Sequence, residues 1–218
     1  MLLKPIQRHP TDSEEGLTLI ECLMGILILT SILVGIAPPL GIVVATRVQN
    51  RRAEQAQQLA QGEVDRIRVI VEQGSYAERD LPELGDSAPS TLGPRRSPNP
   101  DCNDANQRTT LTQLLQVDLD GNCNTDFLVQ TFRTQENRID QETLGSFTMG
   151  VRVYSAVAQN NLGGLQTQRA SLKLAGGEGS QRSNPLAVIS TRIVRSDREY
   201  SLCLYNPSLC GINPPANP

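Results

Sequence analysis

The feature that most constrains this chain is a run without any charged residue, from Cys22 to Ala45. The run reads CLMGILILTSILVGIAPPLGIVVA and is dominated by aliphatic residues. About 20 apolar residues in a helix cross the hydrocarbon core of a bilayer. Thr30 and Ser31 are tolerated in such a helix because their hydroxyls can donate to carbonyls of the preceding turn. The sequence therefore predicts one membrane-spanning helix near the N-terminus.

Two ordinary explanations of this run are a secretory signal peptide and a simple anchor. A signal peptide has a shorter apolar region followed by a cleavage site of small residues. Here the run is longer, and Pro38, Pro39 and Leu40 provide no Ala-x-Ala site. Hydropathy leaves the simple anchor open. Glu21, however, stands at the start of the run, and an ionisable residue there is costly unless it is partnered, which indicates a function.

The residues at the start of the run, 16–21, read GLTLIE. This pattern resembles the prepilin processing and methylation motif of type IV pilins and type II secretion pseudopilins. The resemblance implies that a prepilin peptidase cuts between Gly16 and Leu17, that the new amine of Leu17 is methylated, and that Glu21 acts in assembly. It also places Pro38 where many pilins carry a helix-kinking proline. The family usually has Phe where this chain has Leu17.

The resemblance implies a structural subunit, a pseudopilin or minor pilin, assembled into a pilus-like filament for secretion or motility. The expected partners are other pilin or pseudopilin subunits, the prepilin peptidase, the inner-membrane assembly platform and membrane lipid. The stretch TLIECLM and the overall layout are also similar to pseudopilins of cyanobacterial secretion systems for hormogonium polysaccharide export and gliding. A methylated, cationic Leu17 amine of one subunit would keep a buried Glu21 of its neighbour ionised.

The expected location is a single pass through the cytoplasmic (inner) membrane, with an extracytoplasmic C-terminal domain and assembly into a periplasmic or surface filament. Lys4 and Arg8 favour a cytoplasmic N-terminus, although the arginines at 47, 51 and 52 oppose the positive-inside rule. The alternative is a monomeric membrane-anchored extracytoplasmic binding domain that never assembles.

An amphipathic pattern continues beyond the run, through residues 46–73. Apolar residues recur at spacings close to three, four and seven, as an amphipathic helix requires: Val48, Ala56, Leu59, Val64, Ile67 and Val71. Gly74 is a helix stop, and Pro38-Pro39 is expected to bend or break the helix. The stripe predicts packing on the globular domain, with a coiled-coil stalk as the alternative.

The remaining residues predict a small sheet domain. Residues 75–100 predict a loop because they carry five prolines: Pro82, Pro89, Pro94, Pro98 and Pro100. Residues 126–132, 146–154 and 186–194 are rich in β-formers and predict an antiparallel meander. The fold class is therefore α+β and pilin-like, with a long N-terminal transmembrane-plus-amphipathic helix packed on a small antiparallel β-sheet. The expected segments are a leader (1–16), an assembly helix (17–45), an amphipathic continuation (46–74) and a globular domain (75–218).

Five cysteines support an exported domain. Cys22 lies in the apolar run and behaves as a small apolar residue. The other four allow three pairings, and proximity in the sequence favours Cys102–Cys123 and Cys203–Cys210. Disulfides persist outside the cytoplasm. Zinc is the competing use, but the chain has no CxxC pair and a single histidine, His9.

Oxygen-bearing side chains alternate in one polar segment, as calcium ligands do: Asp118, Asp120, Asn122, Asn124 and Asp126. The segment is not an EF-hand, because Gly121 is its fourth residue and Val129 its twelfth. A polar turn with Asp-Gly chemistry explains the same residues. We favour the turn and keep calcium as the alternative and as the one candidate cofactor.

Composition argues against two further classes. The net charge of -3 does not suggest nucleic-acid binding. The single histidine lies in the predicted leader, so the processed chain would have no imidazole base. No GxSxG, Walker or dinucleotide-binding motif is present. We therefore expect no enzymatic activity.

Overall fold

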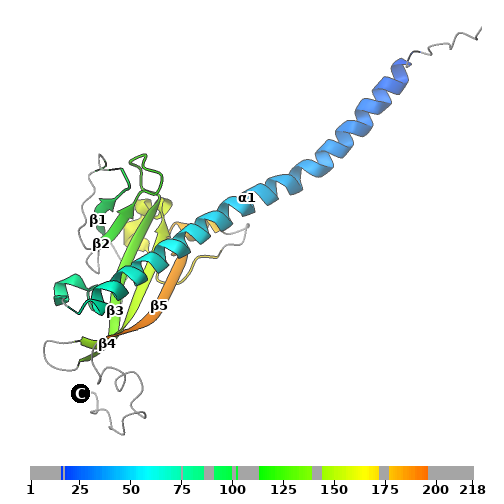
Figure 1. Cartoon of the computed structure of the whole chain (residues 1–218). Helices are drawn as coiled ribbons and strands as arrows, with labels where there is room; N and C mark the ends of the chain where they lie inside the picture. Colours follow the sequence, from blue (N-terminus) through cyan, green and yellow to red (C-terminus); the bar gives the residue numbers. More distant parts are fainter. Residues whose placement is uncertain are drawn as a thin grey trace, which may run out of the picture. The chain divides into compact units, whose positions relative to one another are not determined.

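The computed structural model describes residues 16, 18–74, 76–85, 91–99, 102, 113–138, 144–171 and 177–195. The chain divides into two compact units, Met1–Val44 and Ala45–Pro218. Helix α1, Leu19–Glu72, contributes residues to both units (Figure 1). The α+β class is confirmed, because this helix is followed by a five-stranded sheet.

The second unit is built on a sheet with the strand order β1-β2-β3-β4-β5. The strands are β1 (Thr91–Arg96), β2 (Gln113–Val117), β3 (Phe127–Arg138), β4 (Leu144–Ser155) and β5 (Ala187–Val194). Strands β3, β4 and β5 pair antiparallel in chain order, as the meander predicts. Strands β1 and β2 pair parallel, so the prediction of a purely antiparallel sheet was wrong. A parallel pair needs a crossover of a dozen or more residues, and residues 97–112 supply it.

Strand β1 lies within residues 75–100, which were expected to form a loop. That prediction was wrong for residues 91–96. Gly93 and Pro94 disfavour a strand, but an edge strand tolerates proline because only one of its sides must donate to a neighbour. The register with β2 shifts between Leu92 and Arg95, at these two residues. The same segment contains the short helix η1 (Glu78–Asp80) and a parallel bridge between Leu84 and Arg133.

The second half of α1 packs against the sheet. The helix contributes a stripe of buried residues at spacings of three and four to the main core: Ala56, Ala60, Val64, Ile67 and Val71. The sheet residues in this core include Val117, Val129, Phe147, Val151 and Ile193. Helix packing on the sheet is therefore confirmed, and this stretch is not a coiled-coil stalk. Of the predicted stripe, Val48 is 48% exposed.

The ends and interruptions of α1 follow local chemistry. The helix ends at Glu72, and Gly74 has a φ of 71° with its N–H donating to the Val71 carbonyl at 3.2 Å. This is the glycine stop that the sequence predicts. The helix continues through positions 38 and 39, so the break that was one of two expected effects of Pro38-Pro39 does not occur. Each proline removes a single backbone donor, which a long helix can absorb.

A smaller core lies on the face of the sheet opposite to α1. It contains Leu114, Leu128 and Tyr154 from the strands, with Ala158 and Leu165 beside them. Ala158 belongs to the 3-10 helix η3, Ala156–Gly164. The short helix α2, Gly177–Gln181, precedes β5. These two elements border a cavity beside α1.

Candidate functional site

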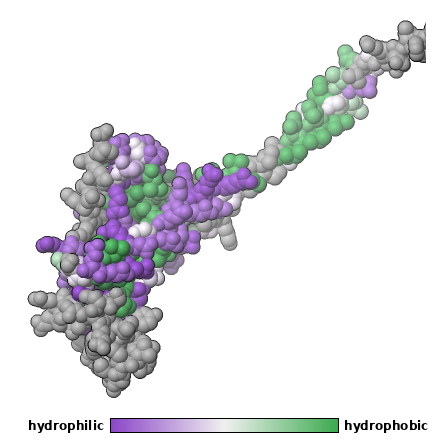
Figure 2. All heavy atoms as spheres, viewed as in Figure 1, coloured by the Kyte–Doolittle hydropathy of each residue, from purple (hydrophilic) through white to green (hydrophobic). Residues whose placement is uncertain are grey.

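The N-terminal part of α1 has the composition of a membrane span. Its window Leu19–Ile36 has a mean hydropathy of 2.5 over 18 residues, and none of it is buried in the chain. Figure 2 shows these hydrophobic side chains along the helix. An exposed apolar surface of this extent normally marks a site of contact with a membrane or with another protein. The length and composition of this segment are therefore sufficient for one membrane-crossing helix. Its apolar surface must be buried by lipid or by residues outside this segment.

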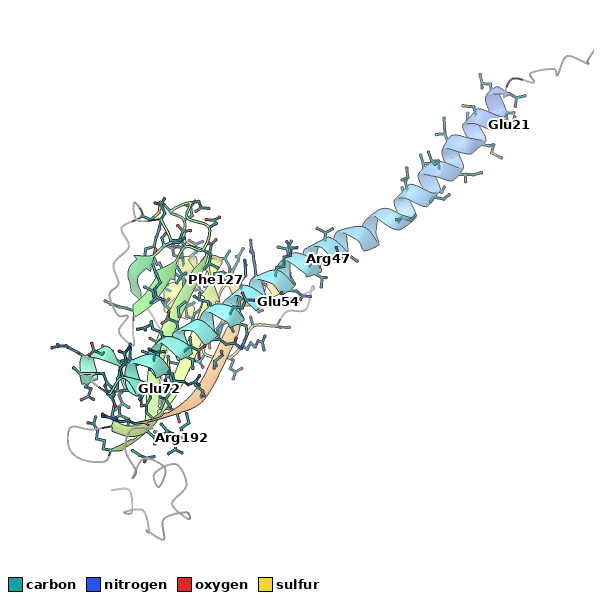
Figure 3. The ribbon with its side chains drawn as sticks, in the orientation of Figure 1. Glu21, Arg47, Glu54, Glu72, Phe127 and Arg192 are labelled. Atoms are coloured by element: carbon teal, nitrogen blue, oxygen red, sulfur yellow. A yellow bond between two sulfur atoms is a disulfide. The ribbon has the colours of Figure 1, made fainter. Side chains whose placement is uncertain are left out.

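The first turn of the helix assigns a local role to Glu21, which is labelled in Figure 3. Its backbone N–H donates to the Thr18 hydroxyl at 3.3 Å. Thr18 is thus the N-cap and Glu21 the third helical residue, which is half of a capping box. A carboxylate at this position also interacts favourably with the helix dipole. The pattern Thr-x-x-Glu at positions 18–21 is the sequence signal for this role.

Two further expectations concern the same segment. The hydroxyls of Thr30 and Ser31 donate to carbonyls one turn earlier, at 2.9 Å from Ile26 and 2.8 Å from Leu27 respectively, as predicted. Gly16 is exposed. Leu17 and the side chain of Pro38 lie outside the described residues, so cleavage, methylation and the proposed role of Pro38 remain expectations.

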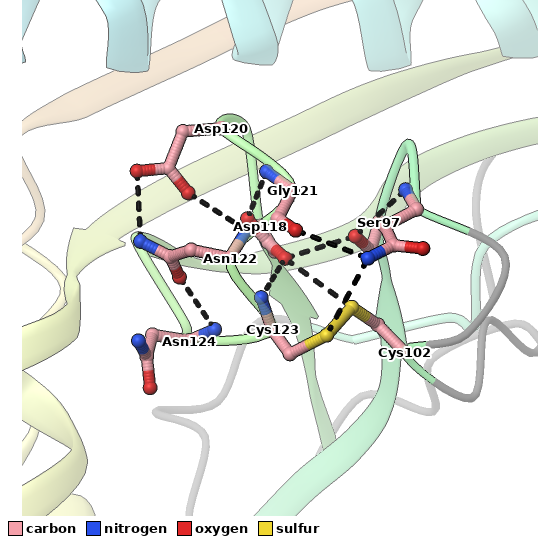
Figure 4. The surroundings of a disulfide bond; sticks show 9 residues. Ser97, Cys102, Asp118, Asp120, Gly121, Asn122, Cys123 and Asn124 are labelled. Carbon is pink, nitrogen blue, oxygen red and sulfur yellow. Dashed lines mark hydrogen bonds between the residues drawn. A yellow bond between two sulfur atoms is a disulfide. The ribbon is translucent and has the colours of Figure 1, made fainter.

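A disulfide joins Cys102 to Cys123, the pairing that sequence proximity favours (Figure 4). Their Cα atoms are 5.2 Å apart. The second expected pair, Cys203–Cys210, lies outside the described residues. Cys22 has a free, exposed thiol on the apolar helix.

The disulfide lies beside Asp118, with the Cys102 Sγ atom 3.8 Å from the Asp118 Oδ2 atom. The Asp118 side chain accepts hydrogen bonds from backbone groups of the predicted calcium loop. Asp118 is 1% exposed. Its Oδ1 accepts from the Gly121 N–H at 2.8 Å, and its Oδ2 accepts from the Ser97 hydroxyl at 2.9 Å and from the Cys123 N–H at 2.8 Å. Burial alone raises the pKa of this carboxyl, but the hydrogen bonds from Ser97, Gly121 and Cys123 outweigh it and hold the pKa below its usual value.

The fold brings together the three carboxylates among the five predicted ligands. Carboxylate oxygens of Asp118, Asp120 and Asp126 lie within 4.8 Å of one another. The Asn122 amide instead bonds to Asp120 and to the Asn124 N–H, which is Asx-turn geometry. The Asp126 carboxylate accepts from the Leu119 N–H at 2.8 Å. All three carboxylates thus have hydrogen bonds within the loop, as a polar turn requires.

Two charged clusters were missed by sequence reasoning. Glu63 of α1, which is 3% exposed, accepts from Arg66 at 3.0 Å and from Arg96 of β1. Glu78 of η1 accepts from Arg133 at 2.7 Å and from Arg138 at 2.9 Å, both in β3. Only the Glu63–Arg66 pair has a helical spacing visible in the sequence. The other contacts join residues more than thirty positions apart, so no local pattern signals them.

Comparison of the chain with protein-family models, with characterised proteins and with solved structures finds no match. The resemblance to pilins therefore rests on the motif at 16–21 and on the apolar run that follows it.

Proposed function

We propose that this chain is a structural subunit, a pseudopilin or minor pilin, that is cut by prepilin peptidase and assembled into a pilus-like filament for secretion or motility. The observation that carries the proposal is the apolar stretch Leu19–Ile36, which has no cover within its own unit and starts at the GLTLIE motif. Lipid covers this stretch while the subunit is stored in the membrane. The corresponding helices of other subunits cover it in the filament.

Glu21 links processing to assembly in this proposal. A carboxylate packed among apolar helices needs a positive partner to remain charged. Cleavage after Gly16 creates that partner as the amine of Leu17 in a neighbouring subunit. Before cleavage the amine does not exist, so an unprocessed subunit lacks the partner for Glu21 and stays in the membrane.

The domain after the span is placed outside the cytoplasm in this proposal. The Cys102–Cys123 disulfide supports that placement, because disulfides persist in oxidising compartments and are rare in the cytosol. The subunit then crosses the cytoplasmic membrane once and contributes its domain of residues 75–218 to a periplasmic or surface filament. The assembly platform in the inner membrane would extract it from the bilayer.

The first test is the N-terminal mass of the protein isolated from its native membrane. We expect a species that begins at Leu17 and carries one additional methyl group. An intact Met1, or a cut beyond residue 37, would contradict processing and leave an anchored or secreted domain.

A substitution separates the two roles of Glu21. Glutamine serves in a capping box as glutamate does, but it cannot neutralise an amine. We therefore expect Glu21→Gln and Glu21→Ala each to lower incorporation into filaments by about tenfold or more, measured as the sheared filament fraction against total subunit. Glu54→Gln, at an exposed position of the same helix, should incorporate normally. If Glu21→Gln assembles like the unchanged chain, the charge of Glu21 has no role in assembly.

The second candidate is a monomeric membrane-anchored extracytoplasmic binding domain that takes calcium at Asp118, Asp120 and Asp126. The convergence of these carboxylates favours it. We rank it second because hydrogen bonds within the loop already engage all three. Calcium titration should leave Tm unchanged. A rise in Tm that is absent in Asp120→Asn would reverse this ranking.

A further inference from the structure

A cavity of about 400 Å³ lies beside the first turns of α1 in the second unit. The helix lines it with four residues, and η3, α2 and the residue after α2 contribute one each: Ala45, Val48, Gln49, Arg52, Val157, Gln181 and Arg182. Neither the sequence motifs nor the proposed assembly role accounts for this cavity.

The described lining of the cavity carries charge of a single sign. Among the described residues that line it, Arg52 and Arg182 are charged and none is a carboxylate. Within the part of the chain that the structure describes, neither guanidinium belongs to an ion pair. Arg52 also borders a second hollow that contains Asp120 and Asp126, but it pairs with neither. Guanidinium groups match phosphate oxygens in geometry and charge, so the cavity fits a phosphate-bearing anion.

A buried acceptor beside the cavity indicates that the ligand also carries a hydrogen-bond donor. The Oε1 atom of Gln49 is buried and has no hydrogen-bond partner. Gln181 is 5% exposed and lines the same cavity. Buried polar groups in folded proteins are almost always hydrogen-bonded. A ligand with a hydroxyl next to its phosphate would satisfy the Gln49 acceptor while the arginines bind the anion.

We propose that this cavity binds a phosphate-bearing polyol and that the headgroup of an anionic phospholipid is its source. Ala45 lines the cavity and lies two residues before Arg47, the first charged residue after the apolar run. A chain that spans the bilayer with that run therefore holds the cavity at the level of the headgroups. The inference rests on the membrane anchoring in the proposed function, but not on processing or filament assembly.

The test measures lipid retention by the full-length chain in a neutral detergent, using native mass spectrometry with phosphatidylglycerol and phosphatidylcholine supplied in equal amounts. We expect phosphatidylglycerol adducts to exceed phosphatidylcholine adducts by about tenfold. The variant Arg52→Gln/Arg182→Gln should lose this preference. The matched variant Arg51→Gln/Arg79→Gln removes the same charge at exposed positions that do not line the cavity, and it should keep the preference.

A third variant tests the cavity without altering its charge. Gln49→Leu keeps both arginines and removes the unpaired acceptor, so we expect the preference to fall by about threefold. Circular dichroism and the intact disulfide mass confirm folding of each variant. If both double-arginine variants lose the preference for phosphatidylglycerol equally, the effect is one of general surface charge and the proposed site is wrong. Equal adducts of the two lipids on the unchanged chain would also contradict the site.

Inorganic phosphate separates the two sources of the anion. If millimolar phosphate displaces phosphatidylglycerol and protects the fold as well as the lipid does, a free anion is the ligand and the lipid assignment is wrong. The readout does not depend on the N-terminal mass or on filaments. A chain that is never processed but retains phosphatidylglycerol selectively would thus contradict the proposed assembly role and support this inference.

Discussion

Gly150 in β4 pairs with Phe132 across the β3–β4 ladder, and the aromatic ring lies over the glycine. A Cβ atom on Gly150 would stand 2.1 Å from the Phe132 Cζ atom. The Arg152 guanidinium covers the ring at 4.3 Å from its centroid and donates to the Gln130 Oε1 atom at 3.0 Å. Glycine is needed here for close packing, since the ring fills the space that a side chain would take.

We therefore predict that Gly150→Ala lowers the free energy of unfolding by about 1–3 kcal/mol through overpacking, measured by urea denaturation of the detergent-solubilised chain. Gly62→Ala is the control, because Gly62 lies in α1 with nothing within 4 Å of its added Cβ. Gly62→Ala should raise the free energy of unfolding by up to about 1 kcal/mol, because alanine has a higher helix propensity than glycine. Phe132→Leu should recover part of the loss in Gly150→Ala. If Gly150→Ala and Gly62→Ala lower the free energy of unfolding by similar amounts, the packing argument is wrong.

At the scale of elements, the edge of the sheet is held to the helix by charge as well as by apolar packing. Glu63 is almost fully buried on α1, beside the apolar Val64, and pairs with Arg96 of β1. Strand β1 contains a proline and a register shift, so its own ladder is weak. The buried carboxylate compensates by binding β1 to α1 directly.

Replacing Glu63 by glutamine should lower the free energy of unfolding by about 1–3 kcal/mol, because the buried acceptor loses its charge while the Arg96 guanidinium keeps its own. The change is measured by denaturant titration. Asp65→Asn is the matched control, since Asp65 pairs with Arg68 at the exposed surface, and it should change stability by less than about 0.5 kcal/mol. Glu63→Gln and Arg96→Gln should also be non-additive, and strict additivity would exclude a direct coupling.

At the scale of the whole molecule, ionised carboxylates join segments that are distant in the sequence. Glu78 ties η1 to β3, and hydrogen bonds from Arg133 and then Arg138 lower its pKa from the usual 4.5. Asp118 ties the loop after β2 to Ser97, and its pKa is lowered from 3.8. A depressed pKa means that the folded state binds the proton less readily than the unfolded chain does, so the ionised form stabilises the fold.

The sign of this linkage predicts the pH dependence. The stabilisation by Glu78 and Asp118 is complete above their unfolded pKa values of 4.5 and 3.8, and it is lost as the pH falls through their lower folded values. We expect Tm to be flat from neutral pH down to about pH 5 and to fall below pH 4.5. In Glu78→Gln, the decrease of Tm just below pH 4.5 should be smaller. A Tm that rises on acidification below pH 4.5 would contradict the assignment.

The sequence by itself determined the features that depend on neighbouring residues. The apolar run, the helical period up to Val71, the stop at Gly74 and the β-rich segments that became β3, β4 and β5 are local patterns, and local energetics act on them directly. The pairing of Cys102 with Cys123 was predicted for a related reason, because closing a shorter loop costs less entropy.

Tertiary structure alone decided the features that depend on contacts between distant residues. The parallel pairing of β1 with β2, the contact of Glu63 with Arg96 and the hydrogen bond from Ser97 to Asp118 arise only when the sheet forms. The cavity between Arg52 and Arg182 has the same origin. In each of these contacts at least one partner lies in a segment whose own sequence favours a loop or a turn, and packing of the helix against the sheet overrides that local preference.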